Sequence, residues 1–307
     1  MNFALNVLGT ASALPTTCRY PSAQVLDVRG RLFLLDCGEA AQINLRRQKI
    51  SFLKISDICI SHIHGDHIFG LFGLLSTMGM LGRTGTLNIY GPRSLGPILD
   101  FFKTTFAEGF QYEINHVVMT MTEPEVVMST KNIELLSFPL NHRIECYGYL
   151  IREKQPELNV RKEAIGRYGL SLAEIACLKR GEEVLREGLP INAEVAYQPY
   201  VPRSYAYCSD TAPFPELSSW VKGVSLLYHE ATFPIEMKDF AQQTFHSTTA
   251  DAARCALEAG AGKLVIGHYS SRFPDVTPFL EEARAIFPET FLAHEGDIFE
   301  VPLERLG

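Results

Sequence analysis

Short apolar stretches recur along the chain, and each is about as long as a β-strand. Residues 3–9 form the first stretch, and residues 23–28 and 32–35 flank a turn at Arg29-Gly30. This pattern predicts one strand followed by a β-hairpin. The same reasoning predicts strands at residues 55–61, 87–90, 133–138, 147–151, 205–208, 225–228, 263–266 and 299–302.

Longer apolar or amphipathic stretches lie between these strands and predict helices. Residues 249–259 follow the possible cap residues Ser247 and Thr248 and stop at Gly260, as helix start and stop signals require. Helices are also expected at residues 68–81, 94–106 and 275–286. Because each half of the chain has strands followed by helices, we expect an α/β fold with two face-to-face sheets and helices outside.

Polar residues stand where several of these predicted strands end. They are Asp36, His62, His64, Asp210, Glu230 and His268. Strand ends are the places where α/β folds gather functional side chains. We therefore expect these residues, although distant in sequence, to contribute to one site.

Residues 152–200 interrupt the pattern, because they are rich in Lys, Arg and Glu and lack a clear strand period. From Arg161 to Arg180 there are five basic and two acidic residues, a local net charge of +3 in a chain of net charge −7. The overall charge argues against a general nucleic-acid binder but allows a local basic patch. We interpret the segment as an insertion that projects from a single domain of residues 1–307. An ordinary solvated helix pair is the alternative.

Composition places the chain among globular proteins. Its 307 residues are 46% hydrophobic and 21% charged, which excludes a disordered or collagen-like chain. No apolar run approaches the roughly 18 residues of a membrane span, and no signal-peptide pattern is present. The seven cysteines are scattered and contain no CxxC pair, so we expect buried thiols in a cytoplasmic protein.

The strongest chemical signal is an HxHxDH string at residues 62–67. In an extended segment His62 and His64 point to the same side, so both can bind one metal ion. Asp66 and His67 lie at the turn into the next helix, point elsewhere and can serve a second ion. Imidazole together with carboxylate suits Zn²⁺.

Two metal ions require more ligands than this string supplies. His142, Asp210 and His268 are candidates, because each lies at or just after the end of a predicted strand. A carboxylate at Asp210 can bridge two ions. A single His or Asp at a strand end is common in proteins that bind no metal. These three residues are candidates because together they complete a set of ligands for two ions.

Together these motifs resemble the metallo-β-lactamase fold superfamily and, within it, the ribonuclease Z family of tRNA 3′ endonucleases. HxHxDH is specific only for the superfamily, whereas the HEAT and HST strings indicate the family. The matching segments run in family order: LDCGE at 35–39 with Gln42, SHIHGDH at 61–67, NHR at 141–143, YGY at 147–149, SDT at 209–211, HEAT at 229–232, HST at 246–248 and GHYSSR at 267–272.

The resemblance implies a four-layer αββα sandwich with two Zn²⁺ ions per chain. It assigns the ligands position by position: His62, His64 and His142 to the first zinc, Asp66, His67 and His268 to the second, and Asp210 to both. It also places Asp36 behind the ligands, where the carboxylate would orient the loop that carries them.

The implied reaction removes the 3′ trailer of a tRNA precursor, leaving a 3′-hydroxyl on the tRNA and a 5′-phosphate on the trailer. By the same resemblance Asp66 accepts the proton of the attacking water. His246, supported by Glu230, donates a proton to the leaving 3′ oxygen. Arg272 would hold a phosphate oxygen.

Members of the family form homodimers and carry an arm that grips tRNA, inserted between the third-ligand motif and Asp210. Residues 152–200 occupy that interval. The Gly-Pro motif usual in bacterial arms is absent, and Tyr168-Gly169-Leu170 stand in its place. Phosphate contacts are expected from Arg161, Lys162, Arg167, Lys179 and Arg180.

The main alternative is a phosphodiesterase on the same dinuclear zinc fold that acts on small molecules or other non-tRNA substrates. Deletion of the insertion distinguishes the two, because it would abolish only the cleavage of tRNA. A di-iron oxidoreductase is disfavoured, since it typically has Glu within the His cluster and a flavin-binding partner domain. A non-catalytic RNA-binding relative should have lost ligands, and all the expected ligand residues are present.

Overall fold

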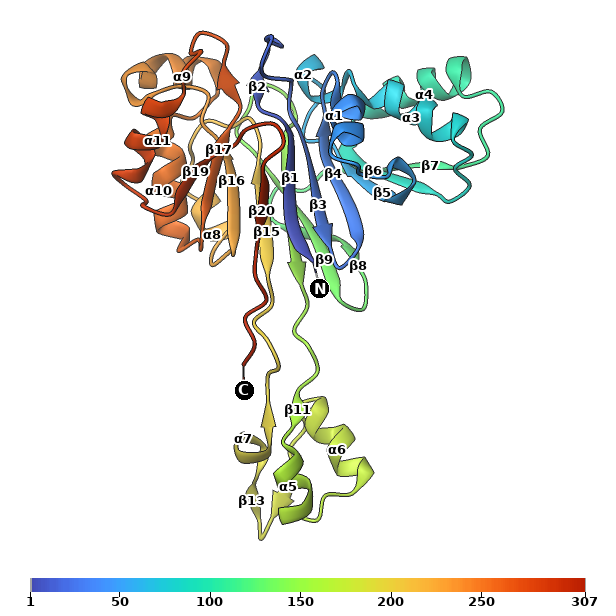
Figure 1. Ribbon diagram of the computed structural model, residues 1–307, viewed down its shortest axis with the longest axis vertical. Coiled ribbons are helices and arrows are strands. Elements are labelled where there is room, and N and C mark those ends of the chain that lie inside the picture. Colours follow the sequence, from blue (N-terminus) through green and yellow to red (C-terminus); the bar gives the residue numbers. More distant parts are fainter. Residues whose placement is uncertain (1, 307) are drawn as a thin grey trace.

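The computed structural model describes residues 2–306, in which two seven-stranded sheets face each other and one segment projects from the body (Figure 1). The first sheet has the order β20 (Ile298–Glu300), β1 (Phe3–Gly9), β3 (Ala23–Val28), β4 (Arg31–Cys37), β5 (Ile55–Cys59), β6 (Leu87–Pro92) and β7 (Ile114–Met119). The second has the order β19 (Thr290–Leu292), β17 (Leu264–Gly267), β16 (Leu226–Glu230), β15 (Ser204–Cys208), β10 (Tyr147–Glu153), β9 (Ile133–Pro139) and β8 (Glu125–Ser129).

Helices cover the outer face of each sheet (Figure 1), so the predicted four-layer α/β sandwich is confirmed. The first sheet is covered by α1 (Ala41–Arg47), α3 (Leu71–Met80) and α4 (Leu95–Phe106). The second is covered by α8 (Leu217–Trp220), α10 (Thr249–Ala259) and α11 (Thr277–Arg284). No helix in residues 2–306 is long and apolar enough to cross a bilayer.

The apolar layer between the two sheets is rich in tyrosine. Tyr149, Tyr205, Tyr207 and Tyr228 are almost completely buried there, and the rings of Tyr207 and Tyr228 stack with centroids 5.2 Å apart. A buried phenol needs a hydrogen-bond partner. The Tyr207 hydroxyl donates to Asp36 at 2.7 Å, so the core directly supports a residue that was predicted for the site.

The apolar stretch predicted as one helix at 68–81 is divided into α2 (Gly65–Ile68) and α3 (Leu71–Met80). Gly70 lies at the break and contacts the end of β4. A Cβ atom at Gly70 would lie 2.0 Å from the carbonyl oxygen of Gly38. Only glycine permits this approach, so a tertiary contact interrupts a segment whose apolar pattern favours a continuous helix.

The projecting unit, which we define as residues 154–203, leaves the body after β10 and returns into β15 (Figure 1). It contains α5 (Lys162–Arg167), α6 (Leu172–Lys179), α7 (Asn192–Val195) and the strand pairs β11 (Asn159–Val160) with β14 (Ala196–Tyr197) and β12 (Leu185–Arg186) with β13 (Leu189–Pro190). It also has a small apolar core formed by Ala164, Leu170, Leu178, Val184, Ile191 and Val195. The unit is therefore structured, and its helix pair packs on its own core.

Candidate metal centre

The residues predicted as metal ligands lie at one end of the sandwich, where strands end. His62 and His64 follow β5, His142 follows β9, Asp210 follows β15, His268 follows β17, and Asp66 and His67 belong to α2. Because β15, β16 and β17 are parallel neighbours, their last residues share one edge. The fold thus brings the predicted ligands from distant parts of the chain into two adjoining groups, and His246 lies close to Asp210 and His268.

The first group consists of His62, His64, His142 and Asp210. His62 Nε2 lies 2.9 Å from His64 Nδ1, and His142 Nε2 lies 3.3 Å from the same nitrogen. Asp210 Oδ2 is 3.6 Å from His62 Nε2. Burial lowers the pKa of His62, His64 and His142, which keeps these imidazoles neutral, the form that binds a metal ion.

The second group consists of Asp66, His67 and His268. Asp66 Oδ2 lies 3.5 Å from His67 Nε2 and 3.6 Å from His268 Nε2. Burial raises the pKa of Asp66, but His67 and His268 together outweigh burial and hold this pKa well below its usual range. Asp66 is therefore a carboxylate at neutral pH.

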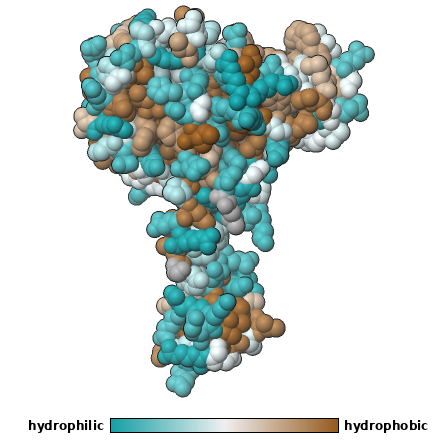
Figure 2. Space-filling view, viewed as in Figure 1, coloured by the Kyte–Doolittle hydropathy of each residue, from teal (hydrophilic) through white to brown (hydrophobic). Residues whose placement is uncertain are grey.

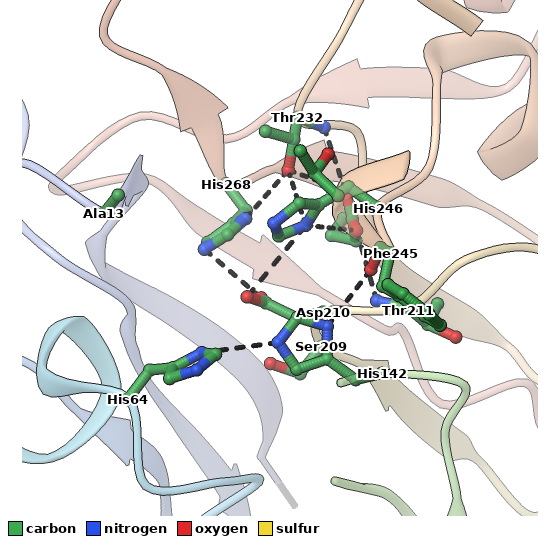
Figure 3. Close-up of polar contacts among 12 residues, drawn as sticks. Ala13, His64, His142, Ser209, Asp210, Thr211, Thr232, Phe245, His246 and His268 are labelled. Carbon is green, nitrogen blue, oxygen red and sulfur yellow. Dashed lines mark hydrogen bonds and ion pairs between the residues drawn. The ribbon is translucent and has the colours of Figure 1, made fainter. Parts of the chain in front are cut away.

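Asp210 lies between the two groups. Its Oδ2 faces His62, whereas its Oδ1 lies 3.2 Å from His268 Nε2 and 3.4 Å from His67 Nε2. Figure 3 shows Asp210 between His268 and His142. This is the arrangement in which one carboxylate can contribute an oxygen to each of two cations.

Three atoms of these groups are buried and have no hydrogen-bond partner of acceptable geometry: His67 Nε2, His268 Nε2 and Asp210 Oδ1. Unsatisfied polar atoms in a protein interior are costly. A cation ligated by these atoms would remove the cost, and neutral imidazole with carboxylate is the donor set that Zn²⁺ prefers. The residues present therefore fit a pair of zinc ions.

The ring nitrogens that face away from the groups are held by other residues. His62 Nδ1 contacts Ser61 Oγ at 2.9 Å, and His268 Nδ1 contacts Thr232 Oγ1 at 2.9 Å. His142 Nδ1 lies 3.1 Å from the carbonyl oxygen of Phe245. Such contacts fix the orientation and tautomer of a metal-binding imidazole.

Asp36 is completely buried behind the ligands. Its Oδ2 lies 2.7 Å from His67 Nδ1, and its two oxygens accept hydrogen bonds from the backbone N–H and the hydroxyl of Ser61 at 2.7 and 2.8 Å. The carboxylate thus joins the start of the ligand string to its last histidine. This is the location that the resemblance implies for Asp36.

Replacement of Asp36 by Ala is expected to weaken metal binding about 10- to 100-fold, because His67 and the Ser61 loop lose their shared anchor. Titration of metal-free protein in competition with a chelator measures the effect. Asp27→Ala is the matched control, because Asp27 lies on the neighbouring strand β3 and caps the hairpin turn at Gly30. Unchanged metal affinity in a stably folded Asp36→Ala protein would contradict this role.

Glu230, which is buried, and His246, which is partly exposed, form a pair beside the metal groups. His246 Nδ1 lies 2.9 Å from Glu230 Oε1 and 4.0 Å from Asp210 Oδ2. Glu230 also accepts hydrogen bonds from the backbone N–H groups of Thr211, Thr232 and Ser247. Burial lowers the pKa of His246, but Glu230 outweighs burial and raises this pKa to about 9.

A cleft of about 590 Å³ opens over this centre. Its lining includes His64, Asp66, His142, Asp210 and His246. Ligands of both groups and the Glu230-supported imidazole therefore face one cavity.

Several residues that line the cleft had no role assigned from the sequence, among them Glu39, Phe69 and Arg143. Phe69 is 69% exposed, and the Arg143 guanidinium lies over the ring of Phe245, 5.9 Å from its centroid. Arg143 directly follows the ligand His142, and this proximity to a ligand was the signal available in the sequence.

Arg272 is not among the residues that line the cleft. Its side chain is exposed, and its guanidinium lies 4.7 Å from the centroid of the Phe240 ring. Its predicted contact with a phosphate oxygen therefore remains a prediction. Arg143, which does line the cleft, is the better placed of the two arginines.

Left-handed backbone conformations concentrate around the centre. Asp36, His268, Phe245 and Ala13 have φ values of 53°, 62°, 60° and 57°. This region is unfavourable for residues other than glycine. Such strain is typical of functional sites, where surrounding structure holds a side chain in place, and the Ala13 backbone N–H in fact donates to Asp66 Oδ2 at 2.7 Å.

Comparison with known proteins identifies the family. A family model described as anti-Pycsar protein Apyc1 matches residues 3–154. A ribonuclease Z from Parabacteroides distasonis is 44% identical over 301 residues, which cover 96% of this chain and 98% of that protein. The chain belongs to the ribonuclease Z family.

Solved structures agree with this family's fold. The crystal structure of human tRNase Z, short form, matches with a TM-score of 0.72 and 23% identity over 97% of this chain and 99% of that chain. The metallo-β-lactamase fold protein YhfI from Bacillus subtilis matches with a TM-score of 0.70 and 20% identity over 98% and 100%. The sandwich is therefore a metallo-β-lactamase fold, as the resemblance implied.

Proposed function

We propose that this protein is a zinc-dependent endoribonuclease that removes 3′ trailers from tRNA precursors. The observation that carries the proposal is the Glu230–His246 pair, which faces the same cleft as both ligand groups in a member of the ribonuclease Z family. The products are a tRNA with a 3′-hydroxyl and a trailer with a 5′-phosphate.

Two Zn²⁺ ions, one in each ligand group with Asp210 between them, would activate water at neutral pH and offset negative charge at the phosphorus. The protein's own groups orient and protonate the reactants. Asp66 is ionised and lines the cleft, so its carboxylate is suited to accept the proton of the attacking water. The Ala13 backbone N–H holds that carboxylate in place.

The leaving group in this reaction is the 3′ oxygen of a ribose, which leaves poorly unless it is protonated. His246 is protonated at neutral pH because of Glu230 and faces the cleft. We therefore assign it as the general acid and Glu230 as the residue that raises its proton affinity. The 3′-hydroxyl product follows from this proton transfer.

We propose that the projecting unit binds the body of the tRNA. Arg161, Lys162, Arg167 and Lys179 make no ion pair within the described residues, so their charges are available for phosphates. Arg180, in contrast, donates two hydrogen bonds to Glu182. Figure 2 shows a mostly polar unit with an apolar patch on one side.

The charge balance of the unit favours the alternative function. Residues 154–203 contain eight basic and seven acidic residues, because the basic excess at 161–180 is largely offset by the acidic residues that follow. A phosphodiesterase acting on small or non-tRNA substrates on the same fold would need no basic arm. Removal of the projecting unit distinguishes the two functions.

We propose a homodimer in which the unit of one subunit serves the site of the other. β10 follows the His142 loop and ends at the projecting unit, and β15 begins there and ends just before Asp210. The unit and the site therefore lie at opposite ends of these strands (Figure 1), and a seven-residue strand spans about 23 Å. Exposed apolar side chains on α3 and α4, including Met80, Phe101 and Phe106, offer a surface for a second subunit.

We also propose that the protein is cytoplasmic, which is supported by seven free cysteines, most of them buried. A reducing compartment keeps thiols in this state. No described cysteine is required for catalysis in this proposal.

The deciding experiment replaces residues 159–197 by a short Gly-Ser linker and compares two substrates. Loss of the unit is expected to lower kcat/KM for a tRNA precursor with a 3′ trailer by at least about 100-fold, roughly 2.7 kcal/mol. Hydrolysis of bis(p-nitrophenyl) phosphate should remain within about twofold, because the cleft is intact. If the intact chain cleaves only the small diester, the alternative function holds.

A further inference from the structure

A buried ionic cluster lies at the root of the projecting unit. Glu153 is the last residue of β10, and Arg203 immediately precedes β15, so the two residues mark where the chain leaves and re-enters the sandwich. Their side chains are 0% and 4% exposed. Arg29, from the turn between β3 and β4, and Tyr200, from the returning segment, complete what we call the root clamp.

Glu153 is the centre of the root clamp. Its Oε1 accepts hydrogen bonds from Arg29 Nε at 2.7 Å and from Arg203 Nη2 at 2.9 Å. Its Oε2 accepts from both the backbone N–H and Nε of Arg203 at 3.0 Å. Arg29 in turn donates to the Tyr200 hydroxyl and lies over the Tyr200 ring.

These contacts join three separate segments. Arg29 lies in a turn of the first sheet, Glu153 lies in the second sheet, and Tyr200, which is reached through Arg29, lies in the projecting unit. Burial raises the pKa of Glu153, but Arg203 and Arg29 outweigh burial and hold this pKa below its usual range. Removing the charge would leave the buried guanidinium of Arg203 and the partly buried guanidinium of Arg29 without their anion, which is costly.

The C-terminal segment also contacts the base of the projecting unit. Tyr200 forms an antiparallel bridge with Arg305, and the Val201 backbone N–H donates to the carbonyl of Glu304 at 3.0 Å. Arg203 Nη1 donates to the carbonyl of Val301 at 3.1 Å. The returning segment is therefore paired with the C-terminal segment before it enters the sandwich.

Among residues 2–306, the hydrogen bonds and ion pairs between the unit and the body lie at the two ends of the unit, residues 154–157 and 198–203. Within the part of the chain that the structure describes, no hydrogen bond or ion pair joins residues 158–197 to the sandwich. The direction of the unit is therefore set where residues 154–157 and 198–203 meet the sheets. A small rotation at the root would displace the far end of the unit by a much larger distance.

We propose that Glu153 is a positioning residue that holds the projecting unit at the angle at which it contacts RNA bound in the cleft of the partner subunit. This inference rests on the proposed function, because it requires a substrate long enough to touch both places. A substrate that fills only the cleft does not depend on the angle of the unit.

The test compares Glu153→Gln with wild-type protein on a tRNA precursor and on bis(p-nitrophenyl) phosphate. We expect KM for the precursor to rise about tenfold or more, with kcat and the small-diester rate unchanged. Asp57→Asn is the matched control, because Asp57 is a buried carboxylate paired with Arg31 at 2.7 Å in the other sheet. Equal effects of both variants on KM would overturn the proposal.

A second measurement keeps the proposal testable if the chain cleaves no tRNA. Fluorescence energy transfer between dyes on the projecting unit and on the sandwich should show one narrow distance distribution in wild type. It should be broader in Glu153→Gln and, to a lesser extent, in Tyr200→Phe, while Asp57→Asn remains narrow. An unchanged distribution in Glu153→Gln would overturn the clamp, whereas absent tRNA cleavage by wild type would overturn only the proposed function.

Discussion

Replacement of Asp210 by Asn is expected to lower kcat/KM at least about 10⁴-fold, more than 5 kcal/mol of transition-state stabilisation. The loss should be similar for a tRNA precursor and for a small phosphodiester. The two oxygens of Asp210 face different ligand groups, one toward His62 and the other toward His67 and His268. Asn offers one oxygen and one N–H donor, so it can serve only one group and adds no negative charge.

Metal content separates this effect from a loss of folding. Elemental analysis of dialysed Asp210→Asn protein should show less than the two zinc ions per chain expected for wild type. Asp57→Asn removes another buried carboxylate, outside the cleft, and should retain both the metal and the activity. Full activity of Asp210→Asn would contradict the assignment of a shared ligand.

Replacement of His246 by Asn is expected to reduce kcat for a tRNA precursor about 10²- to 10⁴-fold, the usual contribution of a general acid. A diester that releases p-nitrophenolate needs no protonation of its leaving group, so its hydrolysis should fall far less. His294→Asn is the control, because His294 is exposed and lies outside the cleft. The metal content of His246→Asn should equal that of wild type, which distinguishes a proton donor from a ligand.

The dependence of kcat on pH also tests the role of His246 as the general acid. Glu230 raises the pKa of His246 to about 9, and a general acid works only when protonated. The value of kcat should therefore be maintained below this pKa and fall as the pH rises through it. Glu230→Gln removes the charge that raises the pKa, so the alkaline fall should move to lower pH. An alkaline limb that stays in place in Glu230→Gln would contradict the pairing.

The sequence predicted a helix or strand correctly where the residues that determine that element lie within it or directly beside it. The helix at 249–259 is found with the predicted bounds, because Thr248 accepts a hydrogen bond from the Asp251 backbone N–H and Gly260 takes the left-handed conformation that ends it. Strands buried on both faces were also predicted, since their apolar residues run without interruption.

Other elements were missed because their stability depends on neighbours. β7 and β8 lie at sheet edges and carry several exposed or half-exposed side chains, so no clear strand pattern marks them in the sequence. At the division between α2 and α3, the Gly70 backbone N–H donates to the carbonyl oxygen of Cys37 at 2.9 Å, a tertiary contact that no local pattern reports. No local pattern predicts that Phe69 and Arg143 line the cleft, because their positions depend on how separate loops pack together.

For the site, the residue types and their positions at strand ends follow from the amino-acid sequence, because strand direction and side-chain alternation are local properties. Three further features arise only from packing of distant segments. They are the position of Asp210 between two ligand groups, the contact between Glu230 and His246, and the closure of Arg29 and Arg203 around Glu153. Each depends on a contact of a few ångströms between residues 16 to more than 100 positions apart. Such distances are set by the shape of the assembled core rather than by any pattern along the chain.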